Sequence, residues 1–229
     1  MPASLEDRIH ALEVQVQRNN DEREINLLMG RHAVNHLAKN MHKTLSFFAL
    51  DEPDVSVEVG DRGVYRGKAA LQTLFTEQFG SAALKGNFLL PFLTTGMVQI
   101  AGDGKTAKGT WRSPSVQAVM PKDGKGDPEP IWLFGAYAVD FIKKGNEWKI
   151  WHFHWYRSIK CNHHDGWVKD QSWLFAGPLA NSPDLESTTY HNPYTPESIQ
   201  DSIPPCPLPY DTYDGPTWMN VDQADLWKM

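Results

Sequence analysis

Four histidines stand at spacings that place them in pairs on one side of a regular element. His32 and His36 are four residues apart in a run whose apolar residues recur with helical spacing, so both are predicted to lie on the apolar face of a helix. His152 and His154 alternate with aromatic residues, so both are predicted to share one face of a strand. Because an imidazole changes its charge near neutral pH, each of the four is a candidate catalytic acid or base.

The strand histidines allow two other interpretations. A His-x-His pair on a strand suits zinc ligands, and a row of hydrogen-bonded histidines suits a subunit interface. No third ligand can be placed beside His152 and His154, although His163, His164 and Asp165 follow closely in the sequence. The sequence therefore predicts no metal, and it leaves open whether this face lines a cavity or an interface. The helical pair could likewise be structural histidines of the core.

Further aromatic and polar side chains are candidates for holding a substrate. Tyr65 ends a predicted hairpin strand, and its phenol could stabilise an oxyanion, which makes it a catalytic candidate. Tyr137 and Asp140 are three residues apart and should face opposite sides of a regular strand, so only one can reach a cavity unless a bulge intervenes. Each tyrosine could instead be a core residue with a satisfied hydroxyl. The predicted substrate-binding residues are Trp111, Arg112, Tyr137, Tyr156 and Asp140.

Helices, a hairpin and long strands are predicted to position these side chains. Apolar spacing predicts helices over 4–18, from 25 to 48 and over 68–79, with a polar break at Asn19-Asn20-Asp21 between the first two. Alternation predicts a hairpin over 55–65 and then strands over 92–100, 105–119, 131–142 and 147–157. The last two strands should pair antiparallel through the turn Lys144-Gly145-Asn146. This order predicts an α+β fold in which helices cover one face of a strongly curved antiparallel sheet.

The predicted organisation is an N-terminal helix over 1–19, a cone-shaped domain over 20–160 and an extended C-terminal tail over 161–229. Residues 183–216 hold eight of the sixteen prolines, which excludes a helix or a central strand there. The tail is also rich in Trp and Tyr, so we expect it to pack on its own core or on a neighbouring subunit. The apolar stripe of 4–18 adds more apolar surface, and both features predict a homo-oligomer, a trimer or a dimer.

Composition excludes several classes of partner. A net charge of −6 without a Lys/Arg run argues against nucleic acid and anionic lipid as partners. No run reaches about 18 consecutive apolar residues, so no membrane span is predicted, and the expected location is cytoplasmic. No Gly-x-Gly-x-x-Gly or phosphate loop is present, so no cofactor is predicted. The 26 aromatic residues (nine Trp, seven Tyr, ten Phe) leave open a heavy core, an interface or a pocket for a bulky ring system.

Several short motifs, taken in order, resemble the SnoaL-like branch of the nuclear transport factor 2-like superfamily over about residues 20 to 157. They are Arg31-His32, Phe48-Ala49-Leu50-Asp51, Gly63-Val64-Tyr65-Arg66-Gly67-Lys68, the stretch 101–111 that ends in Lys108-Gly109-Thr110-Trp111, and Gly145-Asn146-Glu147-Trp148-Lys149-Ile150. The resemblance implies a cone, or cystatin-like roll, around a mostly apolar pocket. Members of this superfamily are cyclases, isomerases, dehydratases, cofactor-free lyases or binding modules, so the fold alone does not assign a reaction.

The chain departs from the dehydratase pattern of that superfamily. Bile-acid dehydratase-like members carry a Tyr and, five residues later, an Asp on the first cone helix, with a His on the opposite strand; here these positions hold His32, Leu37 and either Pro91 or Phe92. The chain is more similar to lyases that release formaldehyde from lignin-derived diarylpropanes without a cofactor. The resemblance thus implies a cofactor-independent lyase acting on a bulky aromatic substrate. The alternatives are a dehydratase or isomerase of a polycyclic substrate and a non-catalytic small-molecule binding module.

Overall fold

The first element is a single helix, α1 (Leu5–Leu37), in a computed structural model that describes residues 4–79, 85–121, 123–174, 192–201 and 203–219. Ser4 caps it, because its hydroxyl accepts a hydrogen bond from Asp7 N while the Asp7 carboxylate accepts from Ser4 N. The predicted break at Asn19-Asn20-Asp21 is wrong: Asp21 is buried inside the helix. Its carboxylate accepts hydrogen bonds from Lys143 Nζ at 2.7 Å and Trp148 Nε1 at 2.8 Å.

The predicted helix from 25 to 48 is in fact interrupted after Leu37. Lys39 adopts a left-handed backbone conformation (φ 58°), which ends α1, and the Asn40 side chain then accepts a hydrogen bond from Lys43 N to begin α2 (Met41–Leu45). The third helix is confirmed as α3 (Gly67–Thr73), which continues as a π-helix over Leu74–Phe79.

Within the described residues, seven strands form one mixed sheet in the order β2-β1-β7-β6-β5-β3, with β4 also paired to β5. The β1/β7 pair is parallel and the other pairs are antiparallel, so the predicted antiparallel sheet is confirmed except at that pair. The β6/β7 hairpin is confirmed, with Lys144 opposite Glu147. The strands are β1 (Ser56–Val59), β2 (Val64–Arg66), β3 (Phe88–Pro91), β4 (Thr94–Ile100), β5 (Thr106–Val119), β6 (Glu129–Lys144) and β7 (Glu147–Asn162).

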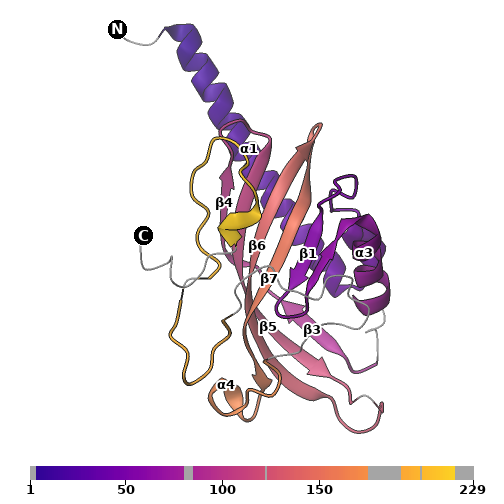
Figure 1. The fold of residues 1–229 in the computed structure, drawn as a ribbon. Helices are drawn as coiled ribbons and strands as arrows, with labels where there is room; N and C mark the ends of the chain where they lie inside the picture. Colours follow the sequence, from indigo (N-terminus) through magenta and orange to yellow (C-terminus); the bar gives the residue numbers. More distant parts are fainter. Residues whose placement is uncertain (1–3, 80–84, 122, 175–191, 202, 220–229) are drawn as a thin grey trace.

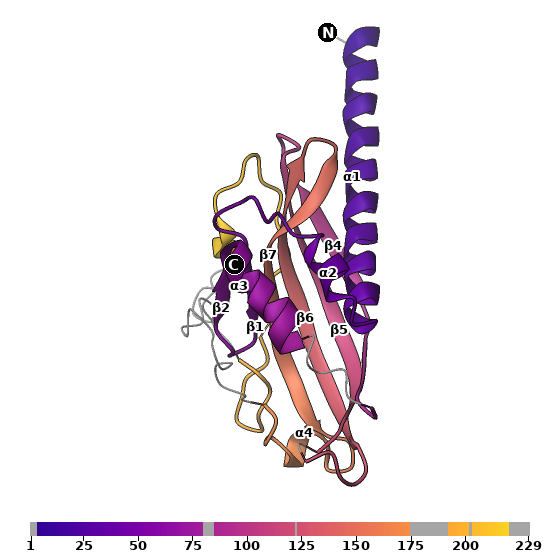
Figure 2. The same cartoon turned by 90° about the vertical axis from the view of Figure 1, so that its right-hand side faces the viewer.

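The sheet is covered on both faces. Helix α1 lies along one side of the sheet, and the segments 192–201 and 203–219 lie on the other side (Figure 2). On the helical side one apolar core joins Ile25 and Met29 of α1 to Phe75, Phe141 and Phe153. The N-terminal half of α1 extends beyond the sheet (Figure 1). No helix in the part of the chain described is long and apolar enough to cross a membrane.

Two irregularities in the β6/β7 pairing decide which side chains face the core. Trp151 lies outside the regular pairing, because Asp140 pairs with His152 and Phe141 with Ile150. Ser158 lies outside it in the same way, because Gly135 pairs with Arg157 and Phe134 with Ile159. Each bulge shifts the alternation by one residue. The inward-facing residues of β7 are therefore Trp148 and Ile150, then Phe153, Trp155 and Arg157, and then Lys160.

The described part of the C-terminal segment is hydrogen-bonded to the outer side of the sheet. Gly102 N donates to Tyr210 O at 2.8 Å, Asp103 N donates to Asp211 O at 3.0 Å, and Tyr194 N donates to Ser158 O at 2.8 Å. The four-residue helix α4 (Gly166–Lys169) follows β7, and a short 3-10 turn over Pro216–Met219 is the last element among the described residues. The division of the chain at 19/20 and 160/161 stays a prediction, and residues 175–191 and 220–229 of the predicted tail lie outside the described residues.

Candidate functional site

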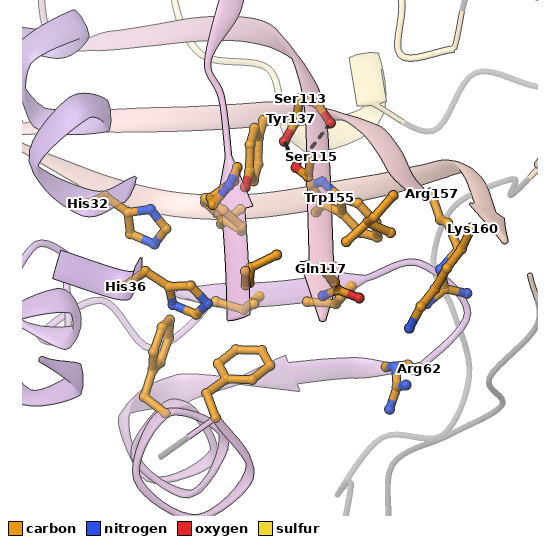
Figure 3. A pocket seen from close by; sticks show the side chains of 18 of the residues that line it. His32, His36, Arg62, Ser113, Ser115, Gln117, Tyr137, Trp155, Arg157 and Lys160 are labelled. Atoms are coloured by element: carbon orange, nitrogen blue, oxygen red, sulfur yellow. Dashed lines mark hydrogen bonds between the residues drawn. The ribbon is translucent and has the colours of Figure 1, made fainter. Parts of the chain in front are cut away.

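A cavity of about 370 Å³ opens between the helices and the inner face of the sheet. This volume is within the range of roughly 300–1,000 Å³ typical of small-molecule sites. Figure 3 shows two histidines at one end and three cationic side chains at the other, with a serine-rich and aromatic wall between them. The lining residues are His32, His36, Lys39, Val57, Val59, Arg62, Phe75, Phe79, Leu89, Pro91, Ser113, Ser115, Gln117, Leu133, Tyr137, Phe153, Trp155, Arg157 and Lys160.

His32 and His36 form the histidine end, as their four-residue spacing on α1 requires. Their rings are stacked, with centroids 5.8 Å apart and planes 12° from parallel. His32 packs on Phe153 at 5.0 Å, and His36 packs edge-on against Phe79 at 5.1 Å. His32 Nε2 and His36 Nδ1 are buried without a hydrogen-bond partner among the described residues. Each imidazole therefore retains a ring nitrogen that a ligand can engage.

The environment of the two imidazoles keeps both uncharged at neutral pH. Burial, with the nearby His36, lowers the pKa of His32 to about 3. Burial, with the positive charge of Lys39, lowers the pKa of His36 to about 4. A neutral imidazole has one nitrogen that accepts a proton and one that donates a hydrogen bond, so both rings stand in the form needed by a base.

The middle of the cavity combines hydroxyl groups with aromatic rings. Tyr137 lies on β6 and its ring packs on Phe153 at 5.2 Å. Burial raises the pKa of its phenol, and a hydrogen bond with Ser113 offsets part of that shift. Ser113 and Ser115 follow on the same side of β5, and Gln117 Oε1 is buried without a hydrogen-bond partner among the described residues. This wall offers donors and an acceptor to a substrate that is otherwise enclosed by rings.

The opposite end is cationic. Arg62 comes from the β1/β2 connection, Arg157 from β7, and Lys160 from β7 beyond the bulge at Ser158. Arg157 is only 4% exposed, and its Nη1 donates to Asp61 Oδ1 at 2.9 Å and to the Leu174 carbonyl at 2.5 Å. Gly135 of β6 allows the close approach of β7 at this point, since a Cβ there would lie 2.3 Å from the Tyr156 carbonyl oxygen.

The sequence left open which way the polar row of β7 faces, and in the structure this row does not line the cavity. His152, His154 and Tyr156 point to the opposite side, because the inner face packs aromatic rings on the helices and the C-terminal segment buries the outer face. His154 Nδ1 lies 3.8 Å from Glu58 Oε2, and its ring stacks on Tyr156 at 3.9 Å. Tyr156 packs with Ile203 and Met219 of the C-terminal segment, and its hydroxyl donates to the Met219 carbonyl. These side chains therefore belong to a packed outer layer.

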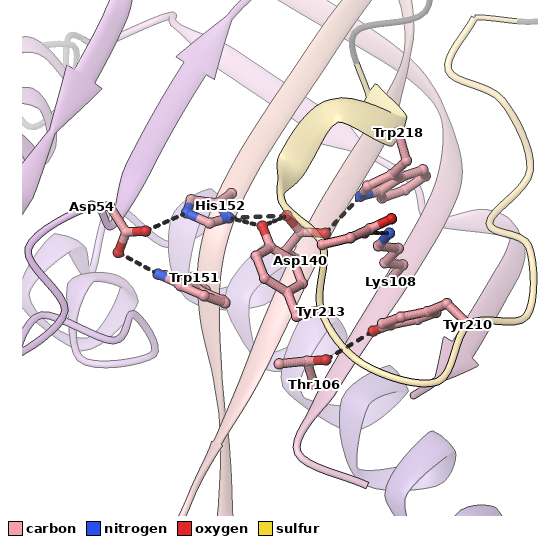
Figure 4. A network of polar contacts seen from close by, with 10 residues as sticks. Asp54, Thr106, Lys108, Asp140, Trp151, His152, Tyr210, Tyr213 and Trp218 are labelled. Carbon is pink, nitrogen blue, oxygen red and sulfur yellow. Dashed lines mark hydrogen bonds and ion pairs between the residues drawn. The ribbon is translucent and has the colours of Figure 1, made fainter. Parts of the chain in front are cut away.

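Asp140 is also on the outer side, at the centre of a polar network (Figure 4). Its carboxylate is fully buried and accepts hydrogen bonds from the Tyr213 hydroxyl at 2.7 Å and from Trp218 Nε1 at 2.6 Å. His152 Nδ1 lies 2.9 Å from it, and Asp54 lies 3.6 Å from the other ring nitrogen. The expectation that Tyr137 and Asp140 face opposite sides is thus confirmed, and Tyr137 is the one in the cavity.

The remaining candidates lie apart from the cavity. Tyr65 is buried in the apolar core and does not line the cavity, and Trp111 packs on Phe141 while its Nε1 donates to Asn26 Oδ1 at 3.3 Å. Arg112 is exposed and points to the outer side of β5. Of the ten predicted site residues, the cavity brings together His32, His36 and Tyr137. No cluster of three or more His, Cys, Asp or Glu able to hold a metal occurs within the described ranges.

Sequence reasoning missed the cationic end and the hydroxyl wall. None of the cationic or serine side chains was among the predicted site residues, and Arg157 shares its face of β7 with the aromatic residues Phe153 and Trp155. A charged residue at the end of an otherwise aromatic row is the one signal in the sequence that could have identified the cavity face. Lys160 carried no such signal, because only the bulge at Ser158 turns it inward.

An α+β cone with an enclosed, aromatic-lined cavity defines a class of proteins that bind or convert small molecules. The profile of the SnoaL-like domain matches residues 17–154, which is more than half of the chain, and the chain belongs to that family. No curated protein matches the sequence significantly.

Solved structures show the same fold at low sequence identity. A putative scytalone dehydratase from Novosphingobium aromaticivorans superposes with a TM-score of 0.54 at 13% identity, covering 69% of this chain and 97% of the other. A hexachlorocyclohexane dehydrochlorinase from Novosphingobium barchaimii gives 0.54 at 11% identity, covering 65% and 93%. A putative dehydratase of the NTF2-like family from Streptomyces avermitilis gives 0.52 at 15% identity, covering 62% and 99%. These likenesses establish the NTF2-like fold of this chain.

Proposed function

We propose that this protein is a cofactor-independent lyase that acts on a bulky aromatic substrate in the cavity between α1 and the sheet. The observation that carries the proposal is the stacked pair His32 and His36, whose buried ring nitrogens have no partner among the described residues of an aromatic-lined cavity. The names of two structural neighbours, a dehydratase and a dehydrochlorinase, denote eliminations on the same fold. A cytoplasmic location also stays a prediction.

The cavity can support an elimination through proton transfer and hydrogen bonding. His36 Nδ1 or His32 Nε2 accepts a proton from the substrate, and the electron pair left behind expels the leaving group. The Tyr137 phenol and the Ser113 hydroxyl are positioned to hydrogen-bond an oxygen that gains negative charge. Phe153 and Trp155 supply ring surface against which an aromatic substrate stacks. Each role uses a side chain that lines the cavity.

A product assay on a panel of diaryl compounds tests the proposal. The purified protein is incubated with diarylpropane diols and with diaryl alcohols, and mass spectrometry follows the alkene product while a separate assay detects formaldehyde. We expect either the diols or the alcohols to be converted without any added cofactor, and also after the protein is dialysed against a chelator. An alkene one carbon shorter, formed together with formaldehyde and water, identifies a deformylating lyase, and loss of water with every carbon retained identifies a dehydratase. Tight binding of these compounds without any product would favour the alternative, a non-catalytic binding module.

A homo-oligomer, a dimer or trimer, is the second part of the proposal. Leu5, Ile9, Leu12 and Val16 form an apolar stripe on α1 and are each between 48% and 69% exposed. This stripe lies on the half of α1 that extends beyond the sheet (Figure 1). A stripe of this kind on a helix is typical of association with another helix. Sedimentation should give a mass above 26 kDa, and replacing all four residues by Gln should yield the monomer; a wild-type protein that sediments as a monomer would exclude the oligomer.

A further inference from the structure

The cavity has a charge that opposes that of the chain as a whole. The protein carries a net charge of −6, yet the described residues lining the cavity include four Lys or Arg side chains and no Asp or Glu. Three of the four, Arg62, Arg157 and Lys160, converge at the end opposite the histidines (Figure 3). We call these three residues the cation cluster. An acidic protein has no general reason to gather positive charge inside an apolar cavity.

The cation cluster is partly buried and has hydrogen-bonding capacity to spare. Arg157 is 96% buried, since its exposed fraction is 4%, and its Nε has no hydrogen-bond partner among the described residues. Its Nη1 is bound by Asp61 and the Leu174 carbonyl, which fixes the guanidinium in place. Lys160 Nζ lies 5.0 Å above the Trp173 ring, a contact that holds the amine at the cavity edge. Arg157 and Lys160 are therefore held in place as donors at this end of the cavity.

Mutual repulsion within the cluster favours binding of an anion. Burial, with the charges of Arg157 and Arg62, lowers the pKa of Lys160 to about 8. Burial and the charge of Arg157 likewise lower the pKa of Arg62, although Asp61 offsets part of that effect. A carboxylate placed among these groups would accept charge-assisted hydrogen bonds and relieve the repulsion.

We propose that the cation cluster is a carboxylate subsite, and that the substrate is an aromatic acid. Its carboxylate binds at Arg62, Arg157 and Lys160, its rings pack on Phe153 and Trp155, and its reacting carbon lies toward His36. This inference rests on the proposed function insofar as it takes the cavity to be the substrate site. It fixes the direction in which the substrate lies, with the anionic end away from the base.

Calorimetric titration with a matched pair of probes tests the subsite. Biphenyl-4-carboxylate and biphenyl-4-methanol have the same rings and differ in charge. We expect the acid to bind the wild-type protein at least about tenfold more tightly than the alcohol at pH 7. Lys160→Met and Arg62→Met should each remove most of this difference while leaving the affinity for the alcohol unchanged. These two positions are used because Arg157 also holds Asp61 and the Leu174 carbonyl, and its loss could unfold the site.

Two lysine variants serve as controls and show which charge causes the preference for the acid. Lys169→Met removes an exposed charge outside the cavity and should leave both affinities unchanged. Lys39→Met removes the cation at the histidine end and should also leave the preference for the acid intact. A loss of preference in Lys39→Met but not in Lys160→Met would overturn the placement of the carboxylate. Equal affinity of the wild-type protein for the two probes, or no binding of the acid at millimolar concentration, would overturn the subsite itself.

The outcomes separate this inference from the proposed function. Selective, Lys160-dependent binding of the acid without product from any diaryl acid would reject the lyase and leave the subsite. Conversion of neutral diaryl compounds, with no preference for the acid probe, would reject the subsite and leave the lyase.

Discussion

The buried polar side chains on the two sides of the sheet differ in whether they have hydrogen-bond partners. On the outer face His152 lies beside Asp140 and Asp54, and Asp140 accepts further hydrogen bonds from Tyr213 and Trp218 (Figure 4). On the inner side the buried nitrogens His32 Nε2, His36 Nδ1 and Arg157 Nε have no hydrogen-bond partner among the described residues. His152 and Asp140 are buried like the inner nitrogens, so burial does not distinguish the two sets.

The difference shows which buried polar groups are available to a ligand. Buried polar groups are almost always hydrogen-bonded, because an unsatisfied one costs about 1–3 kcal/mol. The outer network meets this requirement within the chain, and its role is to bind the C-terminal segment to the sheet. The inner groups meet it only when a ligand or water occupies the cavity. Both sides of the sheet carry the same kinds of polar residue. The presence or absence of hydrogen-bond partners distinguishes a structural network from a candidate binding site.

The largest expected effect is a loss of stability at low pH, caused by protonation of His32 and His36. Their pKa values in the folded protein, about 3 and about 4, lie below the ordinary value of 6.5, so the unfolded chain binds protons more readily. The stability they provide is complete above pH 6.5 and is lost as pH falls toward the folded pKa values. Each histidine should lower the free energy of unfolding by about 1.6 kcal/mol between pH 6.5 and 5. Urea unfolding at a series of pH values measures this loss.

A double variant tests the origin of this acid sensitivity. His32→Gln with His36→Gln should remove most of the dependence between pH 6.5 and 5, since neither glutamine takes up a proton. His163→Gln, which changes an exposed histidine, should keep the wild-type dependence. An unchanged slope in the double variant would mean that the inner pair is not the source.

The second effect is on turnover, and it compares a histidine in the cavity with one on the outer side of the sheet. His36→Gln should lower turnover of the diaryl substrate by about a hundredfold, the usual size of a general-base contribution, without lowering the melting temperature. His154→Gln is the matched variant on the outer face and should keep turnover within a fewfold of the wild type, because its ring does not line the cavity. Steady-state rates of the two variants decide the matter. A larger loss in His154→Gln than in His36→Gln would reverse the assignment of the faces.

The third effect is on stability and belongs to the outer network. Asp140 accepts from Tyr213 and Trp218 and contacts His152, and an asparagine at this position has one acceptor oxygen in place of two. Asp140→Asn should therefore lower the free energy of unfolding by about 2 kcal/mol. Hydrogen exchange over 203–219 should accelerate with it. Asp211→Asn, an exposed change in the same segment, should alter neither measurement.

Local periodicity was enough to predict most elements of the fold. Helical spacing identified α1 and α3, and alternation with a Gly-containing turn identified the β6/β7 hairpin. The continuity of α1 through Asp21 could not be predicted, because it depends on Lys143 and Trp148, more than a hundred residues away in the sequence. Aspartate commonly caps a helix, yet Asp21 lies in the middle of α1, since donors distant in the sequence satisfy its carboxylate.

The candidate site was predictable where one regular element positioned it. The spacing of His32 and His36 placed both in the cavity, since α1 is a regular helix there. The face of β7 was not predictable from residue type, because a segment some fifty residues later covers the polar row and supplies its partners. Lys160 depends on a bulge, which shifts every inward-facing position after it and leaves no clear mark in the sequence.

The smallest expected effect is the pH dependence of carboxylate binding at the cation cluster of the cavity. Burial and the charges of Arg157 and Arg62 oppose protonation of Lys160 and lower its pKa to about 8. The nearby Asp61 is hydrogen-bonded to Arg157, and Trp173, which packs on Lys160, is uncharged. Binding of a carboxylate requires the protonated amine, so affinity should be constant below pH 7 and fall by about tenfold between pH 7 and 9. Titrations of biphenyl-4-carboxylate over this range should show the fall in the wild-type protein, whereas Lys160→Met should bind weakly with no such dependence. Arginines stay charged over the same range, so a fall that persists in Lys160→Met would assign the titration to another group and remove Lys160 from the subsite.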